Sequence, residues 1–323
     1  MTGFRYHSLA LVSAVVTLAV GVVVGVGPLS QAQTTKHEAQ TTALQDRQAG
    51  LRARLATVGA RSVDDHALAK ALAGPLMAGR LKNRTVVVVA APGADAALVR
   101  RTASDLQSAG ATVTGTLSLT QVYVDPGKAQ SPLEDLALRL VPPGVVFTDG
   151  ASAIARVGTV LARSTVTAAD KPPTAIDQKA AEVIAGLDEL GALKLHGDPG
   201  RLAGLAVVVA GPKAHGDQAI TGARDALLGL VAALDNGSQG VVVVGSVDSS
   251  KHDGLIAQVR TSAETRNPST VDTAGSVGGD LATVLALAEQ AGGHAGDYGR
   301  GTGADALLPD ALTPDVAGGT GAG

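Results

Sequence analysis

The sequence predicts an α/β fold in which a doubly wound, mainly parallel sheet follows an N-terminal transmembrane helix and a coiled-coil stalk. Three apolar, β-branched runs support this prediction: Thr85–Ala91, Leu205–Ala210 and Gly240–Gly245. Runs of this kind are typical of strands that are buried on both faces of a parallel sheet. Helical segments alternate with them, and such strand–helix–strand units form right-handed crossovers between parallel strands.

The remaining elements of the domain are predicted from helical spacing and turn residues. Pro92-Gly93 turns the chain after the first strand, and Ser131 begins a capping box with Pro132 at the first helical position. We expect helices over residues 94–109, 131–141, 151–163, 174–190, 217–234, 254–260 and 278–291, and further strands over 111–119 and 270–273.

A long uncharged run, Leu9–Gly27, predicts a membrane anchor. As a helix it would extend about 28 Å, close to the thickness of the hydrocarbon core of a bilayer. Arg5 precedes the run and no cation follows it until Lys36. This asymmetry places the N-terminus in the cytoplasm and the rest of the chain outside it. The alternative is a secretory signal cleaved at Ser30–Ala32, although the apolar run is longer than a usual signal core.

The segment 31–58 predicts a helical stalk, because it contains no Pro and only one Gly. Leu44, Leu51 and Val58 recur every seven residues, and Leu55 occupies the alternate position of a coiled-coil seam. One interpretation is a parallel dimer or higher homo-oligomer. The other is a lone amphipathic helix that packs back on the domain. A further helix begins at Asp64 and is interrupted or turned at Gly74-Pro75 before Leu81.

These patterns divide the chain into four parts. We expect an anchor over residues 1–30, a stalk over 31–81, the α/β domain over 82–300 and a disordered tail over 301–323, which is rich in Gly, Pro and Asp. The net charge of -3 and the lack of a long basic run argue against a nucleic-acid partner. The absence of Cys excludes disulfides, thiolate metal sites and Cys nucleophiles.

The sequence lacks the motifs of nucleotide binding and of hydrolysis. No loop after a predicted strand has the pattern G-x-G-x-x-G or G-x-x-x-x-G-K-[ST], and neither G-x-S-x-G nor H-E-x-x-H occurs. Ser246, Asp248 and His252 are residue types used in nucleophilic catalysis, but their pattern is equally typical of a polar loop before a helix. We therefore predict that the protein is not an enzyme and needs no cofactor for catalysis.

Two segments are more particular than their surroundings. Thr114–Asp125 contains LTQVYVD and carries a strand into a loop, and Gly292–Ala304 (GGHAGDYGRGTGA) places six Gly around His294 and Tyr298. So many Gly indicate unusual backbone dihedrals or the close approach of another backbone. With the opening FRYHSLALVSAVVTLAVGVVVG and the stalk, these motifs make the sequence resemble the mycobacterial copper transport protein B family of actinobacterial envelope proteins.

The resemblance covers almost the full length and implies a non-enzymatic protein of the cell envelope. It implies a role in copper efflux or copper resistance, as a pore-forming component in the outer membrane. The residues themselves predict a membrane partner, but a single apolar span lines a channel only if several chains assemble. The alternative function is a single-pass scaffold or regulator whose α/β domain binds an envelope protein or a cell-wall partner.

Copper is implied by the resemblance alone, and the sequence limits the ligands that could hold it. Met1 and Met77 are the only Met residues, so soft ligands for Cu(I) are scarce. His294, and His215 with Asp217, are candidate ligands for Cu(II) if loops bring them together, because no two His stand at metal-ligand spacing. The alternative for each is a solvated His beside an Asp that caps a helix.

Overall fold

The computed structural model describes residues 28–125, 127, 130–198, 200–211, 219–263 and 267–310. The chain divides between Ala67 and Leu68 into two compact units, and the second unit contains the α/β domain. The expected anchor, Leu9–Gly27, lies outside the described residues. Among the residues that are described, no helix has both the length and the apolar character that crossing a membrane requires.

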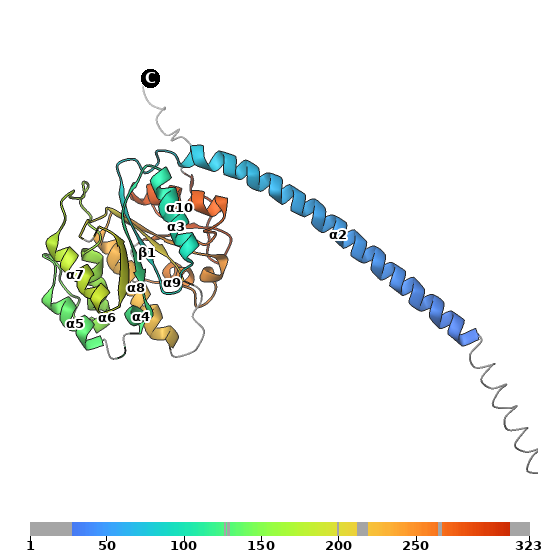
Figure 1. Ribbon diagram of the computed structural model, residues 1–323, viewed down its shortest axis with the longest axis horizontal. Coiled ribbons are helices and arrows are strands. Elements are labelled where there is room, and N and C mark those ends of the chain that lie inside the picture. Colours follow the sequence, from blue (N-terminus) through green and yellow to red (C-terminus); the bar gives the residue numbers. More distant parts are fainter. Residues whose placement is uncertain are drawn as a thin grey trace, which may run out of the picture. The chain divides into compact units, whose positions relative to one another are not determined.

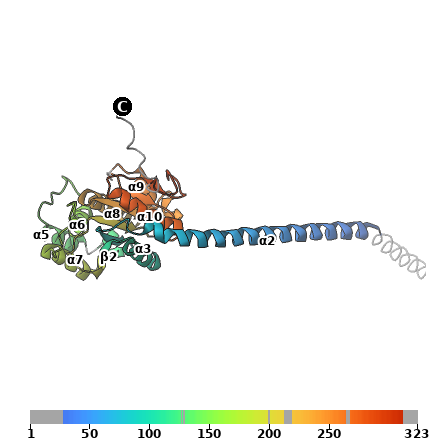
Figure 2. The ribbon, with the colours of Figure 1, turned by 90° about the horizontal axis from the view of Figure 1, so that it is seen from above.

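Helix α2 (Pro28–Met77) is continuous over 50 residues, as Figure 2 shows. The interruption expected at Gly74-Pro75 is therefore wrong. Pro75 lies in the last turn, where its missing N–H removes one hydrogen bond without ending the helix earlier. The four residues of the predicted seam are all exposed, between 55% and 71%: Leu44, Leu51, Leu55 and Val58. A coiled-coil partner would bury these side chains, and the described part of this single chain contains no such partner, so the coiled coil stays a prediction.

The last turns of α2 belong to the α/β domain. Ala73 and Met77 are buried, together with Leu81, in the core on one face of the sheet. The domain therefore begins near Leu68, before the expected boundary at residue 82. The same helix contributes to both units, so no loop or change of composition marks the boundary in the sequence.

Seven strands form one sheet in the order β3-β2-β1-β4-β5-β6-β7. Neighbouring strands are parallel except β2 and β3, which are antiparallel. The chain runs outward from β1 to β2 on one side and from β4 to β7 on the other, so the predicted doubly wound, mainly parallel sheet is confirmed. The strands are β1 (Thr85–Ala90), β2 (Thr112–Leu119), β3 (Leu193–Gly197), β4 (Leu205–Val209), β5 (Gly240–Val244), β6 (Ser269–Val271) and β7 (Asp297–Tyr298).

The central strands are buried on both faces. Val88 of β1 pairs with Val207 of β4, and Val207 pairs in turn with Val242 of β5. All three are fully buried in the same core, while Val87 and Val89 enter the core on the opposite face. This alternation explains why the strands are valine-rich without a polar face.

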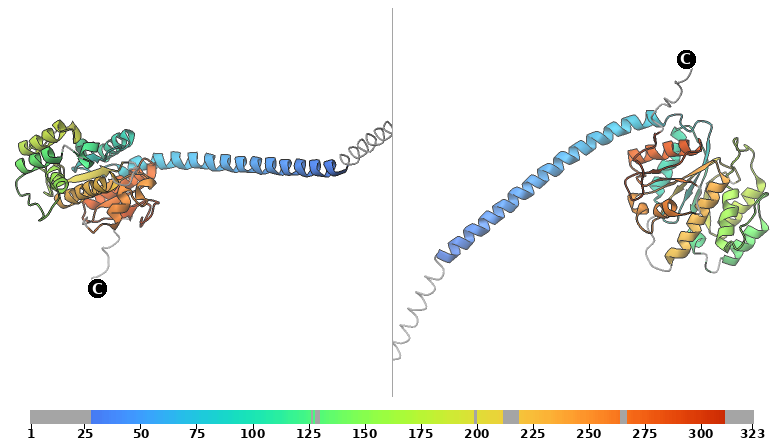
Figure 3. Two further views of the ribbon diagram at one scale, coloured as in Figure 1. Left: turned by 90° about the horizontal axis from the view of Figure 1, so that it is seen from below. Right: turned by 180° about the vertical axis from the view of Figure 1, so that it is seen from behind.

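Helices cover both faces of the sheet and complete three layers (Figures 1 and 3). Helix α3 (Ala96–Ser108), helix α10 (Val277–Gln290) and the end of α2 contribute to one core. The other core includes α4 (Gln121–Val124), α5 (Gln130–Arg139), α6 (Ala153–Arg163), α7 (Gln178–Glu189), α8 (Ala219–Gly237) and α9 (Leu255–Thr261). Figure 3 shows α5, α6 and α7 grouped together. Each helix that the sequence predicts for this domain is present.

The predicted start of the disordered tail, residue 301, is too early in the sequence. Ala306 forms a parallel bridge with Tyr298 of β7, and its carbonyl accepts a hydrogen bond of 2.8 Å from the Gly299 amide. The expectation of disorder is therefore wrong for residues 301–310, because backbone hydrogen bonds fix this glycine-rich segment where apolar periodicity is lacking. Residues 311–323 lie outside the described part of the chain.

Candidate functional site

The glycine-rich loop after α10 surrounds a buried carboxylate. Asp272 follows β6 directly and is fully buried. Its Oδ1 accepts a hydrogen bond of 2.8 Å from the Arg300 amide, and its Oδ2 accepts one of 3.0 Å from the Gly301 amide. Gly299, between β7 and these amides, has φ +133°, a conformation that a residue with a Cβ rarely adopts. The loop thus reaches Asp272 because Gly occupies this position.

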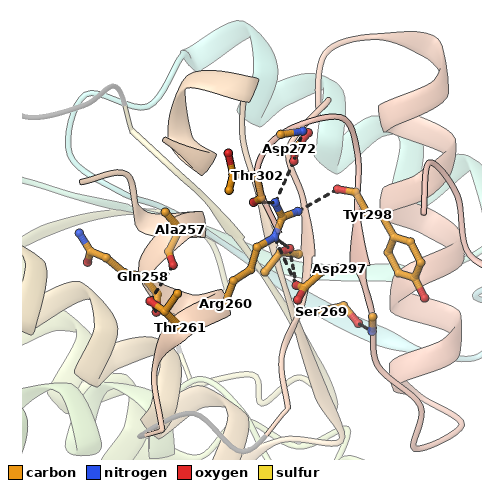
Figure 4. Close-up of polar contacts among 12 residues, drawn as sticks. Ala257, Gln258, Arg260, Thr261, Ser269, Asp272, Asp297, Tyr298 and Thr302 are labelled. Atoms are coloured by element: carbon orange, nitrogen blue, oxygen red, sulfur yellow. Dashed lines mark hydrogen bonds and ion pairs between the residues drawn. The ribbon is translucent and has the colours of Figure 1, made fainter. Parts of the chain in front are cut away.

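Arg260, in the last turn of α9, is the counter-ion of Asp272. Its side chain is 4% exposed, and its Nη1 lies 3.0 Å from Asp272 Oδ2. The same nitrogen donates to the Thr302 carbonyl at 2.8 Å, and Nη2 donates to the Tyr298 carbonyl at 3.1 Å. Figure 4 shows the guanidinium surrounded by these groups.

A second carboxylate completes this arrangement. Arg260 Nε donates to Thr270 Oγ1 at 2.8 Å and lies 3.4 Å from Asp297 Oδ1. The Thr270 hydroxyl donates to the same Asp297 oxygen at 2.6 Å. We call Arg260, Thr270, Asp272 and Asp297 the anchoring cluster. It joins α9, β6 and the glycine-rich loop through charge-assisted hydrogen bonds, which are stronger than neutral ones.

Two tyrosines of the motifs are buried in different ways. Tyr298 of β7 donates to Glu289 Oε2 at 2.5 Å, and burial together with this carboxylate raises the pKa of its hydroxyl. Tyr123, in the LTQVYVD motif, is fully buried beside Gly158, and burial raises its pKa. Within the described chain the Tyr123 hydroxyl has no hydrogen-bond partner.

Thr120, also in the LTQVYVD motif, caps the short helix α4 and donates to the Gly191 carbonyl at 2.6 Å.

The predicted metal ligands are not brought together in the described part of the chain. His294 is exposed after α10, beside a hollow of about 250 Å³ that Asp235, Asn267 and Gln290 also line. His215 and Asp217 lie outside the described residues. Across the described ranges, no three His, Asp or Glu side chains form a group that could hold a metal ion.

The segment with Ser246, Asp248 and His252 forms a polar connection, as the sequence indicates. Residues Val247–Ser250 form a short 3-10 helix, and α9 begins a few residues later at Leu255. Asp248 forms an ion pair of 2.6 Å with Lys251. This Lys251 hydrogen bond holds the pKa of Asp248 below its usual value.

Sequence reasoning singled out the glycine-rich loop but missed the two residues that hold it. Arg260 ends a predicted helix and Asp272 lies in a predicted strand, and nothing in a spacing of twelve residues indicates that they form an ion pair. One signal was available: an Asp at the end of a strand lies at the carboxyl edge of the sheet, where loops converge.

Fold and site together define a class: a three-layer α/β domain after a long helix, with a C-terminal glycine-rich loop fixed by a buried ion pair. The chain belongs to the family described as "Copper transport outer membrane protein, MctB", which it matches over residues 1–309. The family resemblance seen in the sequence is thereby confirmed.

Two curated relatives are similar to the chain over nearly its full length. It is 28% identical to "Copper transporter MctB" of Mycobacterium tuberculosis strain H37Rv, over 94% of this chain and 98% of that protein. It is 27% identical to "Copper transporter MctB" of Mycobacterium leprae, over 95% of this chain and 99% of that protein. The range that the family covers includes the uncharged run at residues 9–27, helix α2 and the α/β domain up to residue 309.

Proposed function

We propose that the protein is a non-enzymatic component of copper efflux or copper resistance in the cell envelope. The observation that carries this proposal is the family match over residues 1–309, which includes every part of the chain that the structure describes except its last residue. The mycobacterial relatives are named copper transporters. We extend that role to this chain.

The proposal includes a membrane tether and assembly through α2. The uncharged run Leu9–Gly27 would hold the chain in a membrane, with the α/β domain outside the cytoplasm. The exposed apolar residues of α2 would then bring several chains together, because one span cannot enclose a channel. This arrangement is the way in which a single-pass chain could contribute to a pore.

The ligands of the described domain favour Cu(II) over Cu(I). Met77 is buried in the core, and the chain has no thiolate. Imidazole and carboxylate groups suit Cu(II), whereas Cu(I) prefers sulfur. His294 is exposed. We propose that His294 and His215 make any direct contact with the metal.

The test is the copper affinity of the purified full-length chain, measured for both oxidation states by competition with chelators. We expect Cu(I) to bind poorly and Cu(II) to bind more weakly at acidic pH, because a protonated imidazole cannot ligate a metal. His294→Ala and His215→Ala should reduce Cu(II) binding, and His252→Ala is the control. A tight stoichiometric Cu(I) site would contradict this choice of ligands.

A second function, a scaffold or regulator of the envelope, is favoured by one observation: the described residues contain no ready-made group of three metal ligands. In this alternative, the domain binds an envelope protein or a wall component, and copper sensitivity arises indirectly. Cells that lack the protein would then be copper-sensitive although the purified chain binds no copper. Restoration of copper resistance by the double variant His215→Ala, His294→Ala would favour this alternative.

A further inference from the structure

A hollow of about 540 Å³ lies beside helix α3, where the helix leaves part of the sheet uncovered. Ala90 and Ala91, at the carboxyl end of β1, line it together with Val99 of α3. No residue of β3 belongs to the core on this side, whereas Leu193 of β3 is buried in the core on the opposite face. The hollow therefore lies where the core on this face does not extend over β3.

Six polar side chains line the hollow, including Ser104 and Gln107 of α3. The other four come from three elements: Arg100 of α3, Thr116 and Ser118 of β2, and His196 of β3. Thr116 and His196 are direct partners in the antiparallel register. Within the described chain, none of these four side chains makes a hydrogen bond or an ion pair. Arg100 thus differs from its neighbour Arg101, which donates to the Gly275 carbonyl at 2.9 Å.

The charge of the hollow has one sign. Arg100 is cationic, the imidazole of His196 can donate a hydrogen bond, and none of the lining residues is acidic. Asp95, at the start of α3, accepts a hydrogen bond of 2.7 Å from the Ala97 amide and is not among the lining residues. An anion would therefore find unpaired donors here and no carboxylate among the lining residues.

The hollow has the size of ligand sites in this fold class, and Ala90 and Ala91 of its lining lie at the carboxyl end of β1. The chain leaves β1 toward β2 and leaves β4 toward β5, so the sheet changes direction between β1 and β4. Open α/β sheets bind ligands beyond the carboxyl ends of their strands near such a point. Small-molecule sites are about 300–1,000 Å³, mostly apolar, with a few polar groups.

We propose that this hollow binds a small organic anion, with a carboxylate or phosphate group and an apolar body. The anionic group accepts hydrogen bonds from Arg100 and His196, and the hydroxyls of Thr116 and Ser118 contribute further donors. The apolar body covers the alanines and Val99. This site is separate from the anchoring cluster, and it does not depend on the role in copper handling.

The test measures the binding of 1-naphthyl phosphate to the full-length chain in lipid nanodiscs by equilibrium dialysis, with empty nanodiscs as the blank. We expect saturable binding of one molecule per chain, at least about tenfold tighter than that of 1-naphthol or of inorganic phosphate, since charge-assisted hydrogen bonds and apolar burial act together. Undetectable binding of 1-naphthyl phosphate, or equally tight binding of 1-naphthol, would overturn the proposal.

Variants locate the site. Arg100→Gln should weaken binding of 1-naphthyl phosphate roughly tenfold, because it removes an exposed guanidinium that would donate to the anionic group. Ala103→Phe should abolish binding by filling the hollow, with circular dichroism as the check on folding. Arg224→Gln on α8, also exposed and on the other face of the sheet, is the matched control and should leave binding unchanged. Unchanged binding in Arg100→Gln would place the ligand elsewhere and overturn the proposal.

Discussion

At the scale of single residues, buried carboxylates affect stability according to their partners. Asp272 is fully buried and paired with Arg260 and two backbone amides. Asp105, on α3, is only partly buried, and one of its oxygens has no partner within the described chain. Burial without a partner disfavours the charged form, whereas complete pairing compensates for the loss of water. The two residues therefore lead to opposite predictions.

We expect Asp272→Asn to lower the free energy of unfolding by about 3–5 kcal/mol, because Arg260 would remain buried without its counter-ion. Thermal unfolding of the full chain, followed by circular dichroism, measures the change. The matched control is Asp248→Asn, which breaks a pair with Lys251 in which both side chains are exposed. Similar shifts in melting temperature for the two variants would contradict the importance of burial.

Asp105 predicts a dependence of stability on pH. Burial, and then the charge of Asp280, raise the pKa of Asp105 to about 6, against the opposite effect of Arg101. A carboxyl with a pKa of about 4 in the unfolded chain is thus protonated more readily in the folded state. Its contribution to stability is present below about pH 4 and is lost as the pH rises through 6.

We therefore expect Asp105→Asn to raise stability at pH 8 by up to about 1 kcal/mol, since solvent screens this partly exposed group. The gain should shrink toward pH 4, because the native Asp105 is then protonated as well. Urea unfolding of the full chain at pH 8, 6 and 4 measures it. The exposed Asp135→Asn on α5 is the control, and a gain that does not change with pH would refute the argument.

At the scale of elements, the central strands could be predicted from sequence and the edge strands could not. The valine runs of β1, β4 and β5 are buried on both faces, and their continuous apolar composition predicts this burial. Strand β3 (LKLHG) is short, mixed in polarity and antiparallel, and strand β7 has only two residues. Strands β3 and β7 form because the neighbouring strands β2 and β6 supply hydrogen-bonding groups. No local sequence pattern reveals this pairing.

The candidate site was predictable only in part, for a related reason. The six Gly of Gly292–Ala304 indicate close backbone approach, and the amides of Arg300 and Gly301 do approach Asp272. The residues that fix the loop come from α9 and β6, and their meeting depends on the order of the strands. Local patterns identify the segment that needs an anchor, but the tertiary fold decides which side chains supply it.

The stalk part of α2 carries a prediction of self-association. Leu44, Leu51, Leu55 and Val58 are exposed, and a partner helix would bury them. Sedimentation of a fragment spanning residues 31–310 should show a concentration-dependent dimer that Leu51→Asp abolishes. Ala53→Asp adds the same charge on the opposite side of the helix and should have little effect. A monomer at high concentration would favour a lone spacer helix.

At the scale of the whole molecule, the extent of the family match agrees with the extent of the fold. The match ends at residue 309, and the described α/β domain ends one residue later, at 310. Pro309 is buried. The segment 301–310 is thus part of the domain that the family shares. The match also includes the uncharged run near the N-terminus, so this run, helix α2 and the α/β domain all belong to the segment that the family shares.

The last prediction concerns how this unit is held in the envelope. The length of the uncharged run, with Arg5 before it, predicts an N-terminus that stays in the cytoplasm and an anchor that is not cleaved. Mass spectrometry of the membrane fraction should find peptides from residues 1–8 on the same chain as the α/β domain, and deletion of residues 9–27 should release the domain from the membrane. Protease added to the outside of spheroplasts should digest the domain and spare the first residues, because the bilayer would separate them. A mature chain that begins near Gln33 would show instead that the run is a signal sequence, and the domain would then need another attachment to the membrane.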